Sequence, residues 1–185
     1  MKVESTALPG VVIITPAVHT DPRGSFRENW QRERYAEAGL PTEWVQDNVS
    51  FSHRRVLRGL HFQHPRPQGK LVTALRGEIL DVAVDVRVGS PTFGRFVAET
   101  LSSENGRQLW VPEGFAHGFV VLSDDALVHY KVTQPYQPGG DRTIAWNDPD
   151  IGIEWPVSAP MMSERDAAAR RLGDFAPEEL PQFQP

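Results

Sequence analysis

Short apolar runs, separated by polar and turn-forming residues, follow one another along most of the 185-residue chain. Residues 78–87 read EILDVAVDVR, in which the aliphatic residues at 80, 82, 84 and 86 alternate with Asp81, Asp85 and Arg87. This period of two predicts a β-strand with one packed face and a second face that lines water or a cavity. Further runs with strand character occupy residues 11–16, 43–52, 70–77, 94–101, 107–112, 118–123, 126–133 and 143–147. Many short strands at this spacing predict an all-β sandwich or barrel.

Two stretches outside these runs have helical character. Residues 29–39 end at Gly39, a residue suited to the position just after a helix. Residues 163–173 begin with Ser163, carry Asp166 three residues on, and end in glycine, as a capped helix does. The proline-rich tail, residues 176–185, is expected to be loosely held or to lie on a neighbouring subunit. We therefore expect a few short helices around the β core.

The length and the absence of any linker favour one domain. A chain of 185 residues is long enough to bury most of its apolar surface in a single core. We assign residues 1–185 to one domain, without internal repeats. About 1–50 form N-terminal strands and a helix, 51–147 form the core, and 148–185 form a C-terminal helix and tail.

Composition excludes several classes of function. The chain has no cysteine, so disulfides, zinc fingers and thiol nucleophiles are excluded. The net charge of −5 argues against nucleic-acid binding, although a few local arginines can still bind a phosphorylated small molecule. No apolar run approaches the roughly 20 residues of a membrane span. The N-terminus MKVESTALPG lacks the pattern of a secretion signal, so we expect no membrane partner and a cytoplasmic location.

The histidines raise the question of a metal site. The PEGFAHGF segment contains the P-x-G-x-x-H motif that includes His117, one of two motifs through which many β-barrels of the cupin type bind metal. In the other motif, Lys70 stands where the carboxylate ligand belongs, with six residues between it and Gly77. A protonated lysine has no lone pair and would repel a divalent ion. His61 and His64 are three residues apart, so on a strand they face opposite sides. These features predict that the protein binds no metal.

The same residues suit proton transfer next to a carbonyl group. His61 can act as a general base, because histidine side chains commonly accept protons near neutral pH. A cation such as Lys70 can stabilise the negative charge that develops on the carbonyl oxygen, as a metal would. Inversion of a carbon through a planar enolate needs a second group on the opposite face, and Tyr130 can supply that proton. Taken alone, each of these residues would more often be structural, and the alignment at Lys70 favours the functional interpretation.

At these residues the chain closely resembles the dTDP-4-dehydrorhamnose 3,5-epimerase family. The matching stretches are VLRGLHFQ, QGKLV, DVAVDVR, GSPTFG, VPEGFAHGF, YKVTQPYQP, WNDP and SERD, in family order from about Asp21 to Asp166. The resemblance implies a cupin-like jelly roll, a homodimer, and a reaction that needs no metal or organic cofactor. It also implies dTDP-4-dehydro-6-deoxy-D-glucose as the substrate, with inversion at C3 and C5 on either side of the C4 ketone.

The resemblance further implies roles for individual residues. His61 resembles the base, Tyr130 the proton donor and Lys70 the group facing the C4 oxygen, while Asp166 resembles the carboxylate that orients the base. Residues that resemble substrate contacts are Arg23, Glu28, Gln46, Asn48, Arg58, His117, Tyr136, Asp141 and Arg165. Tyr136 resembles the tyrosine that stacks on thymine. Asp141 stands where glutamate is usual, and Arg165 where lysine is common.

Several alternatives stay open. Asp166 has a competing structural role, because the Ser163-x-x-Asp166 spacing also matches a capping box at a helix start. Asp81 and Asp85 have two possible roles: they form hydrogen bonds with active-site groups, or they neutralise cations such as Arg87. The same residues would serve an epimerase that inverts only C3 or only C5, as in antibiotic-sugar synthesis. Two other classes are a metal-dependent cupin oxygenase or isomerase and a non-catalytic binder of sugar nucleotides.

Overall fold

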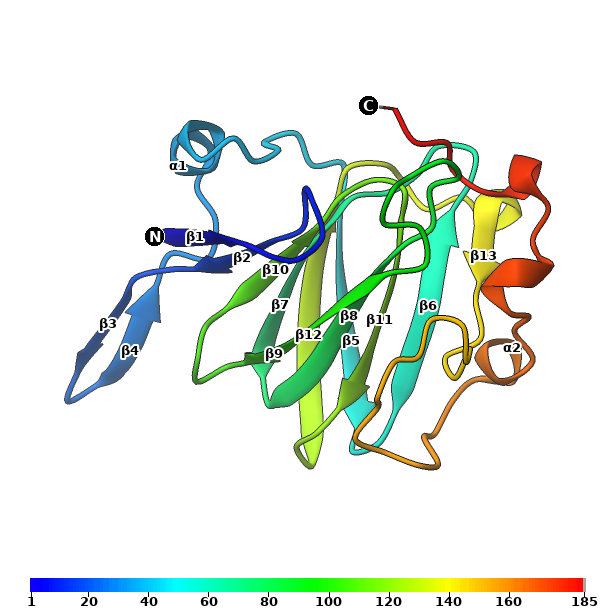
Figure 1. The fold of residues 1–185 in the computed structure, drawn as a ribbon. Helices are drawn as coiled ribbons and strands as arrows, with labels where there is room; N and C mark the ends of the chain where they lie inside the picture. The colour runs from blue at the N-terminus through cyan, green and yellow to red at the C-terminus, as the bar shows by residue number, and fades with distance from the viewer. Residues whose placement is uncertain (185) are drawn as a thin grey trace.

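Two antiparallel β-sheets packed face to face form the body of the molecule in the computed structural model, which describes residues 1–184 (Figure 1). The first sheet has the order β1-β2-β10-β7-β12-β5 and the second β13-β6-β11-β8-β9. Strands of the first sheet are β1 (Lys2–Ser5), β2 (Val12–Thr15), β10 (Gln108–Val111), β7 (Lys70–Arg76), β12 (Asp125–Val132) and β5 (Gln46–His53). Strands of the second are β13 (Asp141–Thr143), β6 (Leu57–Gln63), β11 (Phe115–Val121), β8 (Glu78–Asp85) and β9 (Phe96–Ser102). A hairpin of β3 (Val18–Asp21) and β4 (Gly24–Arg27) projects from this body. The predicted jelly-roll sandwich is confirmed.

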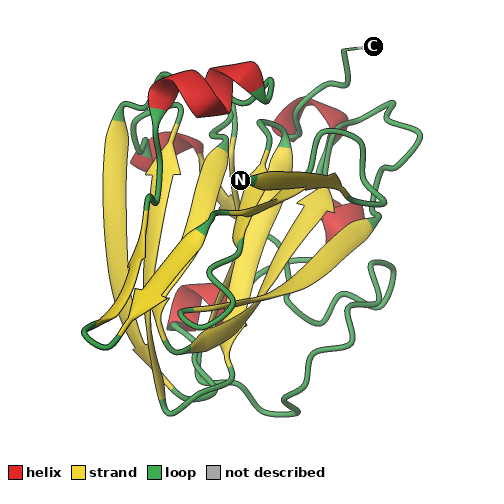
Figure 2. Ribbon diagram, turned by 90° about the vertical axis from the view of Figure 1, so that its left-hand side faces the viewer, coloured by secondary structure: helices red, strands yellow, loops and turns green. Residues whose placement is uncertain are grey.

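Helices are short and lie around the edges of the sheets (Figure 2). They are α1 (Arg32–Glu37), α2 (Glu164–Ala167), η1 (Pro138–Gly140), η2 (Leu172–Asp174) and η3 (Pro177–Glu179). The first predicted helix is confirmed in shortened form. The second, at 163–173, is wrong beyond its first turn, because the chain becomes extended and Arg170 forms an isolated bridge with Ile144, the residue after β13. Within residues 1–184, no helix combines the length and the apolar character of a membrane span.

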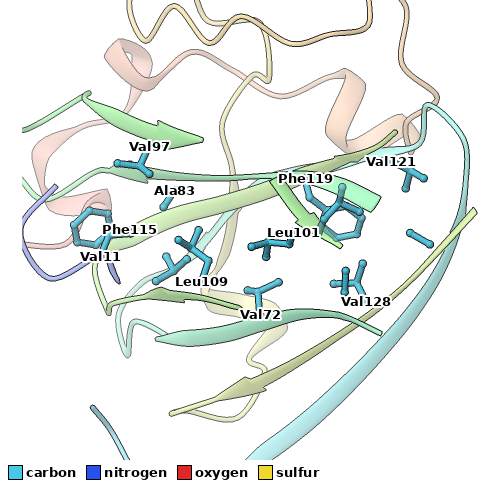
Figure 3. Packing of buried hydrophobic residues seen from close by; sticks show 14 of the residues in the cluster. Val11, Val72, Ala83, Val97, Leu101, Leu109, Phe115, Phe119, Val121 and Val128 are labelled. Atoms are coloured by element: carbon cyan, nitrogen blue, oxygen red, sulfur yellow. The ribbon is translucent and has the colours of Figure 1, made fainter. Parts of the chain in front are cut away.

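Apolar packing occurs on both sides of the second sheet. Between the sheets, side chains of β7, β10 and β12 meet those of β8, β9 and β11; Figure 3 labels Val72, Leu101, Leu109, Phe119 and Val128 among them. On the outer face of the second sheet, aliphatic residues of β8 pack against buried side chains from the C-terminal segment. These C-terminal residues are Leu172, Phe175 and Leu180. The expectation of a loosely held tail is therefore wrong for the described residues, because the tail covers this face.

One of the two faces of β8 differs from the sequence-based prediction. The face of Val82 and Val84 packs under the C-terminal segment, as expected. The face of Asp81 and Asp85 does not meet water, since both side chains are fully buried between the sheets. Each carboxylate has a cationic or hydrogen-bonding partner of its own, so this face combines apolar packing with polar pairs.

The pattern of apolar residues does not predict four of the strands, β1, β3, β4 and β6. Of these, β6 matters most for function because it carries His61. The predicted strand at 143–147 is displaced: β13 covers Asp141–Thr143 and pairs with β6, and Ile144 forms the isolated bridge described above.

The turn between β7 and β8 depends on Gly77. Its φ is +74°, and a Cβ atom there would lie 2.0 Å from the Asp125 carbonyl oxygen and 2.5 Å from the Ser123 hydroxyl. A backbone carbonyl cannot move away without breaking the β12 register, so a side chain at position 77 meets both conformational strain and a steric clash. The turn sets the β7–β8 connection just after the strand that begins at Lys70.

We expect Gly77→Ala to lower the free energy of unfolding by at least about 3 kcal/mol, from the strained φ together with the clash. Gly39→Ala is the matched control, because Gly39 has a similar φ of +72° but no atom within 4 Å of an added Cβ. It should lose only about 1–2 kcal/mol. Urea unfolding of the two variants measures the difference, and equal losses would show that steric contact at position 77 is unimportant.

Candidate active site

A cavity of about 220 Å³ opens where one edge of the first sheet, β5 and β12, faces the β6–β13 edge of the second. Its lining residues are Gln46, Asn48, His61, Gln68, Lys70, Tyr130, Tyr136 and Asp141. All but Gln68 are residues that the sequence assigns to the site. The strands at this edge belong to separate backbone ladders, so polar side chains from both sheets can converge there.

A second cavity of about 340 Å³ adjoins the first at His61. It is lined by Val56, Leu57, Arg58, His61, Met161, Met162, Ser163, Arg165 and Asp166. Three more predicted residues, Arg58, Arg165 and Asp166, therefore lie around the same histidine. His61 belongs to both cavities and is the residue that connects them.

His61 and Asp166 form a hydrogen-bonded pair. The imidazole Nε2 lies 2.8 Å from one carboxylate oxygen of the buried Asp166, and the Gly59 N–H donates to the other oxygen at 3.3 Å. Burial alone would raise the pKa of the Asp166 carboxyl, but the hydrogen bond and charge of His61 outweigh it and lower that pKa. An ionised Asp166 accepts a hydrogen bond from the Nε2–H group of His61, and Nδ1 of His61 is then the nitrogen that can accept a proton.

The helix cap does not occupy the Asp166 carboxylate. Ser163 Oγ accepts from the Asp166 backbone N–H at 3.1 Å and thereby caps α2. The carboxylate itself bonds only to His61 and Gly59 among the hydrogen bonds of the described chain. The two roles that the sequence leaves open for Asp166 are thus compatible: its backbone takes part in the cap and its side chain in the pair.

Glycines allow the backbone of β6 to reach Asp166. At Gly59, with φ +131°, a Cβ atom would lie 2.5 Å from the Gly118 Cα of β11. The β6–β11 register shifts between His117 and Phe119 at this point. Only two glycines let the strands approach so closely, and the approach places the Gly59 N–H beside Asp166.

Lys70 lies inside the first cavity and not on a solvated face. Its residue is 8% exposed, and its Nζ lies 3.5 Å from the His61 carbonyl oxygen. Burial lowers the pKa of the Lys70 ammonium to about 8, while the carboxylates of Asp141 and Asp81 oppose this shift. At neutral pH the group is mainly a cation with few protein partners, so it can bind an anionic oxygen.

His117 lies opposite His61 in the β6–β11 register and is also buried. Its Nε2 is 2.7 Å from Asp81 Oδ1. Burial, the largest influence, lowers the pKa of the His117 imidazole despite the favourable charge of Asp81. Of the two interior aspartates, Asp81 therefore contacts this histidine, whereas Asp85 binds the Arg87 guanidinium through both oxygens at 2.8 and 2.7 Å.

Tyr130 reaches the cavity from the sheet opposite His61. It lies on β12 between Asn48 of β5 and Val72 of β7. Burial raises the pKa of the Tyr130 phenol, which keeps it protonated near neutral pH. Because β6 and β12 belong to facing sheets, His61 and Tyr130 approach the cavity from opposite walls.

A polar cluster lies at the rim of the site. The Tyr136 hydroxyl donates to Asp141 at 3.1 Å, and Arg165 donates to the same carboxylate at 2.6 Å. Arg165 also donates to the Thr143 hydroxyl. The two residues at which this chain departs from the usual family residues are therefore paired with each other.

Three predicted contacts line neither cavity: the buried His117, which pairs with Asp81, and the two residues Arg23 and Glu28. Arg23 is in the β3–β4 turn, where its highly exposed guanidinium pairs with Asp21 at 2.6 Å. Glu28 follows the hairpin and pairs with Arg34 of α1 at 3.0 Å. Within one chain, neither lines the space around His61.

Some contributors to the site were missed by reasoning from the sequence. Gln68 lines the first cavity and stands two residues before Lys70, a spacing that could have identified it. Ser52 accepts from Arg58 Nε at 3.0 Å, and Thr143 holds Arg165. No pattern in the sequence marks these two, because their importance comes from contacts between distant strands.

Metal-binding potential is limited among residues 1–184. They contain no group of three or more His, Cys, Asp and Glu side chains that could hold an ion. His61 and His117 each use Nε2 toward a carboxylate, and the positive charge of Lys70 helps to lower the pKa of the His117 imidazole. The absence of a metal cofactor stays a prediction.

Comparison with known proteins identifies relatives along nearly the whole chain. The sequence profile of the family described as dTDP-4-dehydrorhamnose 3,5-epimerase matches residues 5–174. The Pseudomonas aeruginosa enzyme of that name is 51% identical over 176 residues, which cover 94% of this chain and 97% of the relative.

Solved structures give the same result. A Legionella pneumophila dTDP-6-deoxy-D-glucose-3,5-epimerase, in complex with dTDP-4-keto-L-rhamnose, has a TM-score of 0.96 and 47% identity, covering 100% of this chain and 99% of the other. A 4-keto-6-deoxy sugar epimerase from the novobiocin gene cluster of Streptomyces spheroides has a TM-score of 0.94 and 38% identity, covering 99% and 94%.

Burial of Lys70 predicts a specific pH dependence of stability. The folded-state pKa is lowered to about 8 from the ordinary 10.5, so the unfolded chain holds the proton more tightly above pH 8. The loss of folding stability that comes from burying the charged Lys70 ammonium is therefore complete below pH 8, and it declines as the pH rises toward 10.5. Relative to wild type, Lys70→Met should be more stable at pH 7, and this advantage should shrink by about 2 kcal/mol by pH 9.5.

Urea unfolding of both proteins at the two pH values measures this difference, with Lys2→Met as the control for an exposed lysine. An advantage that does not change with pH would mean that Lys70 retains an ordinary pKa in the folded protein.

Proposed function

The chain belongs to the dTDP-4-dehydrorhamnose 3,5-epimerase family and is an isomerase, and we propose the following reaction and roles for its site. The enzyme converts dTDP-4-dehydro-6-deoxy-D-glucose to dTDP-4-dehydro-L-rhamnose in dTDP-L-rhamnose synthesis. The observation that carries the proposal is the placement of His61 and Tyr130 on opposite walls of a cavity that holds the buried Lys70. The identity and near-complete coverage of the relatives support the substrate.

His61 acts as the base at each carbon next to the C4 ketone. Asp166 accepts a hydrogen bond from the Nε2–H group of His61, and this leaves the lone pair of Nδ1 for the substrate proton. Removal of the C3 or C5 proton sends its bonding electrons to the C4 oxygen, and the resulting enolate is planar. Lys70 binds that oxygen, where its charge is most effective because the surroundings are largely dehydrated.

Tyr130 completes each inversion. Its phenol donates a proton to the face opposite His61, giving the epimer and a transient phenolate. Proton exchange with solvent returns His61 and Tyr130 to their starting states before the second carbon reacts. No metal and no organic cofactor enters this scheme, since Lys70 supplies the positive charge at the oxygen.

The remaining predicted residues bind the nucleotide and the sugar. Tyr136 stacks on the thymine from the rim of the cavity, half exposed and therefore accessible. Arg58 and Arg165 attract the diphosphate, because both line the cavity that adjoins His61. Gln46, Asn48, Asp141 and His117 provide further hydrogen-bonding groups for the substrate.

We further propose a cytoplasmic homodimer. Val49 and Phe51, both exposed, point outward from the edge strand β5, and Phe26 on the hairpin is 70% exposed. Exposed apolar groups of this size favour a protein interface. In the dimer, the hairpin carries Arg23 and Glu28 to the partner's cavity, which explains why they lie outside the cavity of their own chain.

An epimerase that inverts a single carbon is the second candidate. It is favoured by the structural similarity to a 3'-monoepimerase from Streptomyces bikiniensis, which has a TM-score of 0.86 and 36% identity and covers 91% of this chain and 86% of the other. The same base, donor and cation would serve, so product stereochemistry distinguishes the two.

Incubation with dTDP-4-dehydro-6-deoxyglucose in deuterated water, followed by NMR, tests the reaction. Wild type should incorporate deuterium at C3 and C5, with or without chelator. His61→Ala should slow exchange at both carbons by about 10²–10⁴-fold, the usual contribution of a general base. Tyr130→Phe should impair inversion more than the initial exchange, since the phenol acts after proton removal.

Full exchange in His61→Ala would reject His61 as the base, and equal loss in both variants would reject the division of roles. Exchange at one carbon only would favour the second candidate. His129→Ala, which changes the histidine next to Tyr130 on the opposite face of β12, is the matched control and should retain exchange.

Mixed dimers test the partner's contribution. Arg23→Ala and His61→Ala proteins should each be nearly inactive as homodimers. If Arg23 serves the partner's cavity, a mixed dimer contains one cavity with both defects and one with neither, so mixing should recover about a quarter of wild-type activity at statistical exchange. No recovery after verified subunit exchange would place Arg23 in its own chain's site.

A further inference from the structure

An ion pair between Arg165 and Asp141 lies between the two cavities that share His61. Arg165 lines the larger cavity and Asp141 the smaller one. Arg165 Nη1 lies 2.6 Å from Asp141 Oδ2, and its Nε and Nη2 donate to the Thr143 hydroxyl at 3.1 and 2.8 Å. In this state the protein itself neutralises the charge of Arg165.

The pair is open to competition from a ligand. The Arg165 side chain is 48% exposed and that of Asp141 is 14% exposed. Ion pairs with this much contact with water favour the paired state over the separated one by only about two- to sixfold. A diphosphate carries at least two negative charges and offers a guanidinium two oxygens, so it can displace a single carboxylate.

We propose that Arg165 exchanges partners when the substrate binds: its ion pair with Asp141 breaks, and its guanidinium binds the diphosphate of the substrate. This inference rests on the proposed function, which supplies the diphosphate. The other two cations are less free to move: Lys70 is buried beside His61, and Arg58 is held by Ser52 and the Phe51 carbonyl oxygen. Among these three cations, Arg165 is therefore the one that can change its partner when an anion binds.

The exchange of partners links binding of the diphosphate to the hydrogen bonds of Asp141 at the rim of the site. Asp141 retains the Tyr136 hydroxyl, which it accepts at 3.1 Å, after Arg165 has left. Its carboxylate then has an oxygen available for a substrate hydroxyl. Binding of the diphosphate thereby prepares the side chains that contact the nucleoside.

Competition by Asp141 has a measurable effect on anion affinity. The apparent Kd is the intrinsic Kd divided by the fraction of molecules in which Arg165 is available. Asp141→Asn removes the competing charge, so the available fraction of Arg165 rises from between one seventh and one third to nearly all, and the binding of inorganic pyrophosphate should tighten by about three- to sevenfold. Phosphorus NMR titration of the full chain at constant ionic strength measures both strong and weak binding. Pyrophosphate has neither a sugar nor a nucleoside, so loss of an Asp141 contact to those parts of the substrate does not affect it.

A double-mutant cycle separates exchange from simple repulsion between Asp141 and the anion. If the effect passes through Arg165, Asp141→Asn should change pyrophosphate affinity less than 1.5-fold in an Arg165→Gln background, about the precision of the titration. Tightening that persists in that background overturns the proposal, and so does unchanged or weaker binding in Asp141→Asn alone. Asp124→Asn is the matched control, because Asp124 forms an exposed pair with Arg54 at 3.1 Å away from both cavities. It should leave the affinity unchanged.

The result is independent of the assay for the reaction. If pyrophosphate binds as predicted but no deuterium enters the sugar nucleotide, the proposed function fails while the exchange at an anion site stands. If deuterium enters normally but pyrophosphate does not bind wild type, the exchange fails and the proposed function stands.

Discussion

Burial of one ammonium group, that of Lys70, is the constraint on which the rest of the site depends. A buried cation destabilises the fold unless charges or dipoles nearby compensate it. Here the compensation is incomplete, with the pKa of Lys70 lowered to about 8 despite the carboxylates of Asp141 and Asp81. The same deficit suits the role that we propose for Lys70, because an enolate oxygen brings the missing negative charge only as the reaction proceeds.

The pair of His61 and Asp166 shows how distant segments maintain this geometry. Asp166 belongs to a one-turn helix that has little stability of its own. Packing of Leu172, Phe175 and Leu180 on the outer face of the second sheet holds the surrounding segment in place. The close approach of Gly59 and Gly118 then brings a backbone N–H to the carboxylate. The C-terminal segment thus supports the orientation of His61, the proposed base, although Leu172, Phe175 and Leu180 do not line either cavity around it.

The sequence predicts the parts of this structure that local pattern determines. The alternation of β8 and the turn residues predict an all-β fold, and the lysine at the cupin carboxylate position predicts an organic cation in the cavity. Strand β6 is not predicted because Leu57, Leu60 and Phe62 are buried without a regular period. The helix at 163–173 is overpredicted because its periodicity does not reveal that Arg170 pairs with Ile144. Pairings such as that of Arg165 with Asp141 depend on tertiary contacts, which no single segment encodes.

The two departures from the usual family residues illustrate why pairs must be considered together. An aspartate in place of glutamate shortens the reach of the acid by one methylene, and an arginine in place of lysine adds a planar group with several donors. Considered singly, each change alters the reach or the shape of a side chain that we expect to contact the substrate. In the structure the arginine spans the distance to the shorter acid and uses Thr143 as a second anchor. The changes therefore preserve a charge-neutral rim in the empty enzyme, and a neutral rim keeps Asp141 from repelling an incoming anion before Arg165 has bound it.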